Sequence, residues 1–369
     1  MIRKDDFSRL EINLAGCLDN YKYFRSRLEA STKLLVLVKA NAYGHGAVEF
    51  ASLMEEAGAD YLAVALPVEG VELREAGIKS PVIVLTAGTD FFHEIIDNDL
   101  EPGIPNLYSL KALCYVLEKR GVTDYPVHIK LDTGMHRLGF MTEEMDELMA
   151  FLKDCRSVRV KSVYSHLAAA DEPDSDDFTL GQVALFKENA DRLTESLGYK
   201  PMYHILNSAG IERFPQYQFD MVRLGIGIYG VSVVPGNHLT PVASFKCKIL
   251  QIRTLEPGDG TIGYGRRGKI APEGTVIATI PVGYADGLDR HLSRGKGQFS
   301  VNGHRVPTIG NICMDMTMLD VTGVDAKVGD TVTIFGENPT VTELARVLDT
   351  IPYEILTSVP RRIERVVIR

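Results

Sequence analysis

The stretch VKANAYGHG, residues 38–46, places an amine where it could do chemistry. Lys39 follows the apolar run at 34–38, which predicts a strand buried on both faces. Burial lowers the pKa of a lysine by disfavouring its charged form, and a neutral amine can attack a carbonyl carbon. Tyr43 and two glycines follow in what we expect to be a loop, where glycine lets a ligand approach the backbone closely. The alternative is an ordinary surface lysine at a strand end.

Eight apolar segments, with helical segments between them, predict the architecture that positions Lys39. The clearest helices are expected at 68–77, 107–120 and 178–197. The strands are expected at 34–39, 61–65, 82–85, 101–104, 127–132, 159–166, 202–207 and 221–224. This α/β alternation predicts a (β/α)8, TIM-like barrel. The strand at 101–104 has the weakest support, because Pro102 and Gly103 are poor strand residues.

Other polar residues follow the predicted strands, and the carboxyl ends of barrel strands meet at one rim. The rim set is Lys39, Lys130, Arg137, His166, His204, Asn207, Ser208 and Arg223. Each has an ordinary explanation by itself, such as a helix cap for Asn207, an ion pair for Arg223 or a barrel position for His166. Lys130 is unusual, because a lysine inside an apolar strand is rarely buried without a partner. Since all of them reach the same rim, we expect a functional site there.

The rim residues favour a site for a phosphate and an aldehyde. The hydroxyls of Tyr43 and Ser208 could hold a phosphate dianion together with the backbone N–H groups near Gly225 and Ile226. The Lys39 amine could capture an aldehyde as a Schiff base. A phosphate and an aldehyde-capturing lysine are what pyridoxal 5'-phosphate requires.

The rest of the chain predicts a different architecture. Strands are expected at 243–255, 275–284, 298–309 and 331–336, and helices at 341–349 and 352–358. Asn302-Gly303 predicts a hairpin turn. We therefore expect the barrel at 14–235 and a mostly β C-terminal domain at 236–369, with an N-terminal strand at 1–13 that packs with the second domain.

Composition argues against several kinds of partner. A net charge of -9 disfavours nucleic acid, whose phosphates favour a basic protein face. The amino terminus is charged from its third residue, so we expect no signal peptide, and no apolar run reaches the ~20 residues that cross a bilayer. The five scattered cysteines lack CxxC spacing, so we expect reduced thiols in a cytoplasmic protein and no metal.

Six motifs, in unbroken order, resemble those of the bacterial alanine racemases. They are VKANAYGHG (38–46), KLDTGMHRLGF (130–140), Asn207-Ser208, MVRLGIGIYG (221–230), GYADG (283–287) and GNICMDM (310–316). The resemblance implies a pyridoxal-phosphate barrel followed by a β-domain. It implies racemisation of L-alanine to D-alanine for peptidoglycan, by a head-to-tail homodimer with shared active sites.

The resemblance also implies roles for individual residues. The cofactor set is Lys39, Tyr43, His166, Asn207, Ser208, Arg223, Gly225 and Ile226. Lys39 would hold the cofactor covalently, and Arg223, supported by His166, would face the pyridine nitrogen. Lys39 and Tyr284 would be the two acid/base groups, with Tyr284 coming from the opposite subunit. The substrate set is Arg137, Met314 and Tyr264, and Lys130 can carry a carbamate in this family.

Three other functions remain open at this point. A racemase of broader range, acting on serine or another small amino acid, is one, since Leu224 and Arg361 depart from the family pattern. A fold-related decarboxylase is the second, although those enzymes resemble one another in placing a glutamate where Arg223 stands. The third is a non-catalytic pyridoxal-phosphate binding barrel, which would typically lack the second domain.

Overall fold

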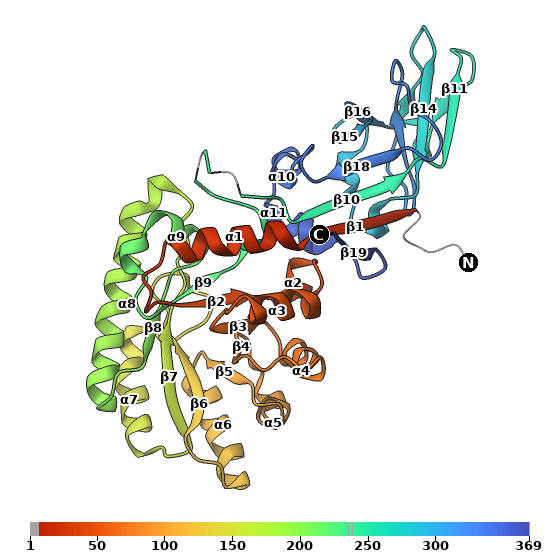
Figure 1. Cartoon of the computed structure of the whole chain (residues 1–369). Helices are drawn as coiled ribbons and strands as arrows, with labels where there is room; N and C mark the ends of the chain where they lie inside the picture. Colours follow the sequence, from red (N-terminus) through yellow and green to blue (C-terminus); the bar gives the residue numbers. More distant parts are fainter. Residues whose placement is uncertain (1–6, 235, 238, 369) are drawn as a thin grey trace.

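Eight parallel strands form a barrel in the first part of the computed structural model, which describes residues 7–234, 236–237 and 239–368 (Figure 1). Around the sheet the strands are β8 (Met202–His204), β7 (Val158–Tyr164), β6 (Tyr125–Lys130), β5 (Glu101–Ile104), β4 (Val82–Val84), β3 (Tyr61–Val64), β2 (Lys33–Leu37) and β9 (Met221–Leu224). β8 and β9 approach each other where Arg223 N donates to Leu206 O at 3.0 Å, which nearly closes the ring. The predicted barrel is confirmed, including its weakest strand, β5.

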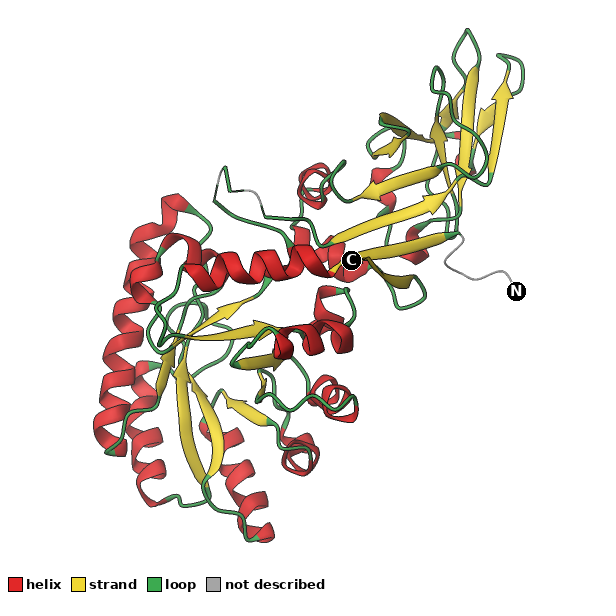
Figure 2. Ribbon diagram, in the orientation of Figure 1, coloured by secondary structure: helices red, strands yellow, loops and turns green. Residues whose placement is uncertain are grey.

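Helices cover the outside of this barrel (Figure 2). They are α1 (Leu14–Ser26), α3 (Ala47–Glu56), α4 (Pro67–Glu75), α5 (Phe92–Asp97), α6 (Leu107–Arg120), α7 (Met145–Asp154), α8 (Asp176–Leu197) and α9 (Ser208–Arg213). The helix predicted at 107–120 has the observed bounds of α6, whose first turn is capped by Asn106 and whose end is marked by Gly121 in the left-handed region. Among the described residues, no helix is long and apolar enough to span a membrane.

A nine-stranded sheet forms the second part of the molecule. Its order is β11 (Gln251–Leu255), β14 (Thr275–Ile280), β17 (Thr317–Asp320), β16 (His304–Ile309), β15 (Gln298–Val301), β18 (Thr331–Phe335), β10 (Ala243–Lys248), β1 (Ser8–Asn13) and β19 (Glu364–Ile368). The short pair β12 (Thr261–Ile262) and β13 (Gly268–Lys269) lies apart from it, and the helices are α10 (Val341–Leu348) and α11 (Pro352–Ser358). The division of the chain at 235 and 236 stays a prediction, and residues 1–6, 235, 238 and 369 of the predicted ranges lie outside the described residues.

Two local predictions were wrong. The segment 243–255 is not one strand, because β10 ends at Lys248 and β11 begins at Gln251 to pair with β14 instead of β18. The segment after Lys39 is not an open loop but α2 (Lys39–Tyr43), a compact left-handed turn that follows β2 after its end at Leu37. The hairpin predicted at Asn302-Gly303 is confirmed, since Val301 pairs with His304.

The α2 turn also contacts the second part of the chain. Gly44 ends the turn with a φ of 86°, and its carbonyl oxygen accepts a hydrogen bond from Arg365 Nε at 2.9 Å. A side chain at Gly44 would collide with the carbonyl oxygen of Leu356 in α11. This glycine therefore allows α11 to rest directly on the turn that carries Lys39.

We expect Gly44→Ala to lower the free energy of unfolding by about 2 to 4 kcal/mol, because the cost of a positive φ and the cost of a collision with the backbone add together. Gly121→Ala is the matched control, since Gly121 also has a positive φ (65°) but no atom within 4 Å of the new Cβ. That control should lose only about 1 kcal/mol. Urea unfolding of both variants measures the difference. Equal losses of unfolding free energy would show that the packing of α11 on the turn does not require a glycine at position 44.

Candidate active site

The turn that presents Lys39 is strained. Four successive non-glycine residues, Ala40 to Tyr43, have φ between 51° and 55°. The left-handed region costs such residues roughly 1–2 kcal/mol each, so their surroundings must hold them there. Ala40 N donates to Glu69 Oε1 at 2.6 Å, and Ala47 N donates to Asn41 Oδ1 at 3.0 Å. Strain maintained in this way fixes the direction in which the turn holds Lys39.

The Lys39 amine is poised to lose its proton more easily than a free lysine. The side chain is half-buried at the carboxyl end of β2. Burial lowers its pKa most, the nearby positive charge of Arg137 lowers it further, and Glu69 opposes both effects. The structure therefore brings Lys39 and Arg137 into one site, as the shared rim predicts.

Ser208, Tyr43 and Gly225 form a cradle beside this turn. Ser208 Oγ accepts hydrogen bonds from Gly225 N at 2.9 Å and from Gly227 N at 3.2 Å. A Cβ at Gly225 would lie 3.0 Å from the Tyr43 hydroxyl, so glycine permits the close approach. The Tyr43 hydroxyl makes no hydrogen bond with the residues that the structure describes. Ile226 begins a short 3-10 helix (Ile226–Tyr229), and its N–H makes no hydrogen bond with a described residue. This N–H and the Tyr43 hydroxyl are donors that suit an anionic group such as a phosphate.

Arg223, in β9, is a buried cation held by five hydrogen bonds. Nη1 donates to His204 Nδ1 at 2.8 Å and to His204 O, and Nη2 donates to Ser165 O, Ile205 O and His166 Nδ1. Burial lowers the pKa of Arg223 to about 10, so it keeps its charge at neutral pH. Its Nε makes no hydrogen bond with a described residue. That N–H is available to an acceptor, such as an unprotonated ring nitrogen.

Accepting a hydrogen bond from Arg223 fixes the protonation of both histidines. A ring nitrogen that accepts carries no proton, so His166 and His204 are neutral. Burial first, and the charge of Arg223 second, lower the pKa of each well below its usual value. The predicted contact of His166 with Arg223 is present, although the contact with His204 is the shorter one at 2.8 Å against 3.2 Å.

A chain of buried hydrogen bonds continues from His204 across the barrel interior. His204 Nε2 lies 2.8 Å from Ser162 Oγ, which lies 2.6 Å from His128 Nδ1. His128 Nε2 is 2.8 Å from Glu101 Oε2, and Lys161 Nζ donates to Glu101 Oε1 at 2.6 Å. Because His204 Nδ1 accepts a hydrogen bond from Arg223, the proton of His204 is on Nε2, which donates to Ser162 Oγ. Ser162 Oγ then donates to His128 Nδ1, and His128 Nε2 donates to Glu101. Burial would raise the pKa of Glu101, but hydrogen bonds from His128 and Lys161 bring it below its usual value.

Lys130 ends β6 inside this positive environment. It is 8% exposed, and its Nζ lies 5.1 Å from the centre of the Tyr164 ring. Burial, and then the charges of Arg223 and Arg137, lower its pKa to about 8, although Asp132 opposes them. Lys130 is therefore partly neutral near physiological pH, which explains how it can be buried without an ion pair to any residue that the structure describes.

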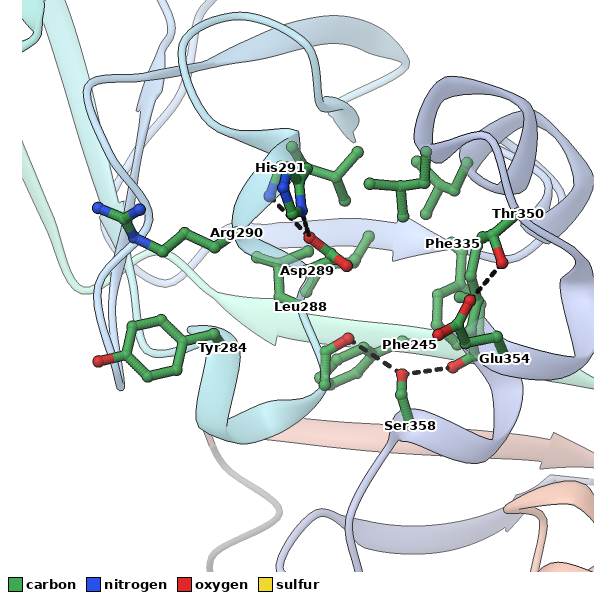
Figure 3. Close-up of a pocket in the computed structure, with 16 residues that line it drawn as sticks. Phe245, Tyr284, Leu288, Asp289, Arg290, His291, Phe335, Thr350, Glu354 and Ser358 are labelled. Carbon is green, nitrogen blue, oxygen red and sulfur yellow. Dashed lines mark hydrogen bonds and ion pairs between the residues drawn. The ribbon is translucent and has the colours of Figure 1, made fainter.

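The predicted β-domain residues form a separate group. Tyr284 N donates to Cys313 O and Ala285 N to Met314 O, both at 3.0 Å, so these segments lie side by side. Tyr264 is tied to the same region, since its carbonyl oxygen accepts from Asn311 Nδ2 at 2.9 Å. In Figure 3, Tyr284 borders a cavity of about 380 Å³, and its ring extends away from Glu354 and Ser358.

This group does not meet the barrel rim within one chain. The side chains of Tyr284, Met314 and Tyr264 are 44%, 54% and 72% exposed. No hydrogen bond, ion pair or aromatic contact among the described residues joins them to the rim residues. The rim residues and this β-domain group are therefore two separate sets within one chain.

Two predicted residues have other contacts. Asn207 caps α9 by accepting from Gly210 N at 2.9 Å, so its side chain positions Ser208 instead of pointing into the cradle. Arg361 forms an ion pair with Glu72 of α4 at 3.0 Å. The sequence reasoning missed Glu101, His128, Lys161 and Ser162. The one sign of them in the sequence is that they are polar residues within the apolar strands β5 to β7, where Lys130 also stands out.

The barrel presents three features at its rim: a lysine with a lowered pKa, a cradle of donors for an anion and an arginine held in place. Together these features define a class of protein, the (β/α)8 barrels that bind a phosphorylated aldehyde. The alanine racemase N-terminal domain model matches residues 12–233, and the alanine racemase C-terminal domain model matches 242–367. The chain belongs to the alanine racemase family.

Individual relatives agree over nearly full length. An alanine racemase of Sorangium cellulosum is 39% identical, covering 97% of this chain and 98% of that protein, and one of Halothermothrix orenii is 37% identical, covering 96% and 95%. The alanine racemase structure of Clostridium difficile 630 has a TM-score of 0.91 at 35% identity, covering 98% and 95%. That of Bartonella henselae, with covalently bound pyridoxal phosphate, has a TM-score of 0.88 at 29% identity, covering 98% and 99%.

Lys130 should make stability depend on pH. Between its folded pKa of about 8 and its ordinary value of 10.5, the unfolded chain binds more protons at this residue than the folded protein does. The free energy of unfolding should therefore rise with pH across this window, by about 3 kcal/mol in total, and Lys130→Met should lack that rise. Urea unfolding in carbonate-free buffer at several pH values measures it. Lys22→Met, on the exposed face of α1, should keep the wild-type slope, and a Lys130→Met slope equal to wild type would contradict the assignment.

Proposed function

We propose that this protein interconverts L-alanine and D-alanine with pyridoxal 5'-phosphate as its cofactor, and so supplies D-alanine for peptidoglycan. Family membership supports the reaction, and the bound cofactor named for the Bartonella henselae relative supports the cofactor. The observation that carries the proposal is the half-buried Lys39 amine, whose pKa is lowered, next to the Ser208 cradle. The cytoplasmic location expected from the sequence stays a prediction.

The rim residues fit this cofactor. Tyr43, Ser208 and the backbone N–H of Ile226 would hold its phosphate, and Lys39 would bind its aldehyde carbon. Arg223 Nε would donate to the ring nitrogen. When bound, the cofactor delocalises the electron pair left after the α-proton departs. An arginine at the ring nitrogen disfavours its protonation, which limits that delocalisation and the side reactions that follow from it.

Racemisation needs a proton removed from one face of the α-carbon and another returned to the opposite face. Lys39, with its lowered pKa, serves one face as a base and, once protonated, as an acid. Tyr284 is our candidate for the other face, and Met314 and Tyr264 belong to the same β-domain group. Arg137 would pair with the substrate carboxylate.

We propose that the barrel rim of one chain and the β-domain group of a second chain meet in a head-to-tail homodimer, each supplying half of an active site. Tyr284 is 44% exposed, and no hydrogen bond, ion pair or aromatic contact among the described residues joins it to the rim of its own chain. Two copies related by a two-fold axis would each place their β-domain group over the partner's rim. Every active site would then need both chains.

Lys130 would carry a carbamate in the working enzyme. A lysine that is partly neutral near pH 8 can react with carbon dioxide, and the negative product would sit among Arg137 and Arg223. Bicarbonate should then alter the pH dependence of stability that carbonate-free buffer reveals.

Incubation with L-alanine in deuterated water tests the reaction. We expect D-alanine to form with deuterium at the α-carbon, because the returned proton comes from groups that exchange with solvent. Tyr284→Phe should slow the reaction by about 10²–10⁴-fold. Tyr108→Phe, a 74% exposed tyrosine on α6, is the matched control and should leave the rate unchanged. Absence of α-deuteration by the wild type would refute racemisation, and faster turnover of serine than alanine would favour the broader-range alternative.

Mixing two inactive variants tests the shared site. In a dimer of Lys39→Ala with Tyr284→Phe, one of the two sites keeps both residues if they come from different chains. Random pairing should therefore restore about a quarter of wild-type activity. If both residues came from one chain, the mixture would stay inactive even after native mass spectrometry shows that subunits have exchanged.

A further inference from the structure

Two cysteines lie in contact on the outside of the barrel, away from the rim. Cys114 is in α6, and Cys155 directly follows α7. Their sulfur atoms are 3.0 Å apart, although the two residues are 41 positions apart in sequence. Both are free thiols, and their three counterparts Cys17, Cys247 and Cys313 have no such contact. A pair this close can form a disulfide with little movement of the side chains.

The surroundings of the pair distinguish the two thiols. Cys114 is 3% exposed, whereas Cys155 is half-buried and lines a polar cavity of about 580 Å³. Lys153, Arg156 and Arg159 line the same cavity, and none of them forms an ion pair with a described residue. Of the described residues, Asp124 is the one acidic residue in its lining. This positive, accessible environment favours a thiolate at Cys155.

Hydrogen bonding acts in the same direction. The bond from Cys114 is the main effect that lowers the pKa of Cys155, and burial opposes it. The same contact, together with burial, raises the pKa of Cys114. An accessible thiolate next to a second thiol is the arrangement found in peroxide-sensitive protein thiols.

We propose that Cys114 and Cys155 form a reversible dithiol–disulfide pair that reacts with peroxides, with Cys155 as the attacking thiol and Cys114 as the resolving thiol. The Cys155 sulfur attacks one peroxide oxygen, the O–O bond breaks, and the other oxygen leaves with a proton as water. The Cys114 sulfur then attacks the Cys155 sulfenic acid, the S–O bond breaks, and the Cys114 proton leaves with the hydroxide as a second water. Two thiols are oxidised to one disulfide, and the peroxide is reduced to two waters.

The bridge would close a segment that carries site residues. Between Cys114 and Cys155 the chain contains β6 with Lys130 and the loop with Arg137. The bond itself joins α6 to the end of α7 on the outer surface. We therefore expect oxidation to preserve racemisation and to stabilise this segment by restricting the unfolded chain. It would also keep Cys155 from irreversible oxidation.

Hydrogen peroxide added to the cofactor-loaded protein tests the pair. After alkylation of the remaining thiols, we expect a linked Cys114–Cys155 peptide by mass spectrometry, an intact mass lower by two hydrogens, and full reversal by dithiothreitol. The oxidised protein should melt several degrees higher than the reduced protein. Cys155 should react at least about tenfold faster than Cys313, the other partly exposed thiol, which has no thiol neighbour.

Two variants separate the roles. In C114S, Cys155 should stop at a sulfenic acid that a dimedone-type nucleophile traps, and should then advance to sulfinic acid. In C155S, Cys114 should remain a thiol. Alanine racemisation by both variants checks that they are folded. The proposal is overturned if the wild type forms no linked peptide, or if Cys155 reacts no faster than Cys313.

Discussion

The buried charge of Arg223 constrains much of the barrel. A guanidinium removed from water is stable only if its donors meet acceptors, and here five acceptors meet them. Two belong to His204 at the end of β8, and the other three lie in the segments that directly follow β7 and β8. The bonds continue from His204 through Ser162 and His128. They end at Glu101, whose carboxylate forms an ion pair with Lys161 at 2.6 Å. Five neighbouring strands, β5 to β9, therefore each place a polar residue inside. The cation is oriented before any ligand arrives, which is the form of electrostatic preorganisation that catalysis requires.

The lysine turn and the second domain depend on each other. The strained turn after β2 is braced by Glu69 from α4 on one side and approached by α11 on the other. Tyr353 of α11 packs against Tyr43, with ring centres 5.7 Å apart, and Arg365 donates to Gly44 O. The residue that would bind the cofactor phosphate is thus in contact with the β-rich part of its own chain. The geometry around Lys39 is a property of the whole molecule and not of the barrel alone.

Local patterns in the sequence predicted the elements but not the contacts between them. The spacing of apolar residues was enough to predict the bounds of α6. The strand β5 forms although Pro102 and Gly103 are poor strand residues. Gly103 has a packing reason, because a side chain there would collide with the Tyr164 hydroxyl. The left-handed turn could not be predicted, because Asn41 is the one residue of Ala40 to Tyr43 that tolerates positive φ well. The others need contacts from elsewhere in the chain, such as the bond from Ala40 N to Glu69, to hold them there. The chain from Arg223 to Glu101 was equally hidden, because it depends on the register of five parallel strands.

The position of β1 has a consequence for how the protein is made. This strand is the first part of the described chain, yet it lies between β10 and β19, pairing antiparallel with one and parallel with the other. A ribosome releases β1 first, and both of its neighbours only after the entire barrel has been synthesised. Until then its backbone donors and acceptors have no partner strand, and such an unpaired strand can form hydrogen bonds with a non-native strand. If the chain were cut after the barrel, the C-terminal fragment would lack β1, an interior strand of its sheet. The barrel is thus an insertion within the β-sheet, and the two parts must be completed as one chain.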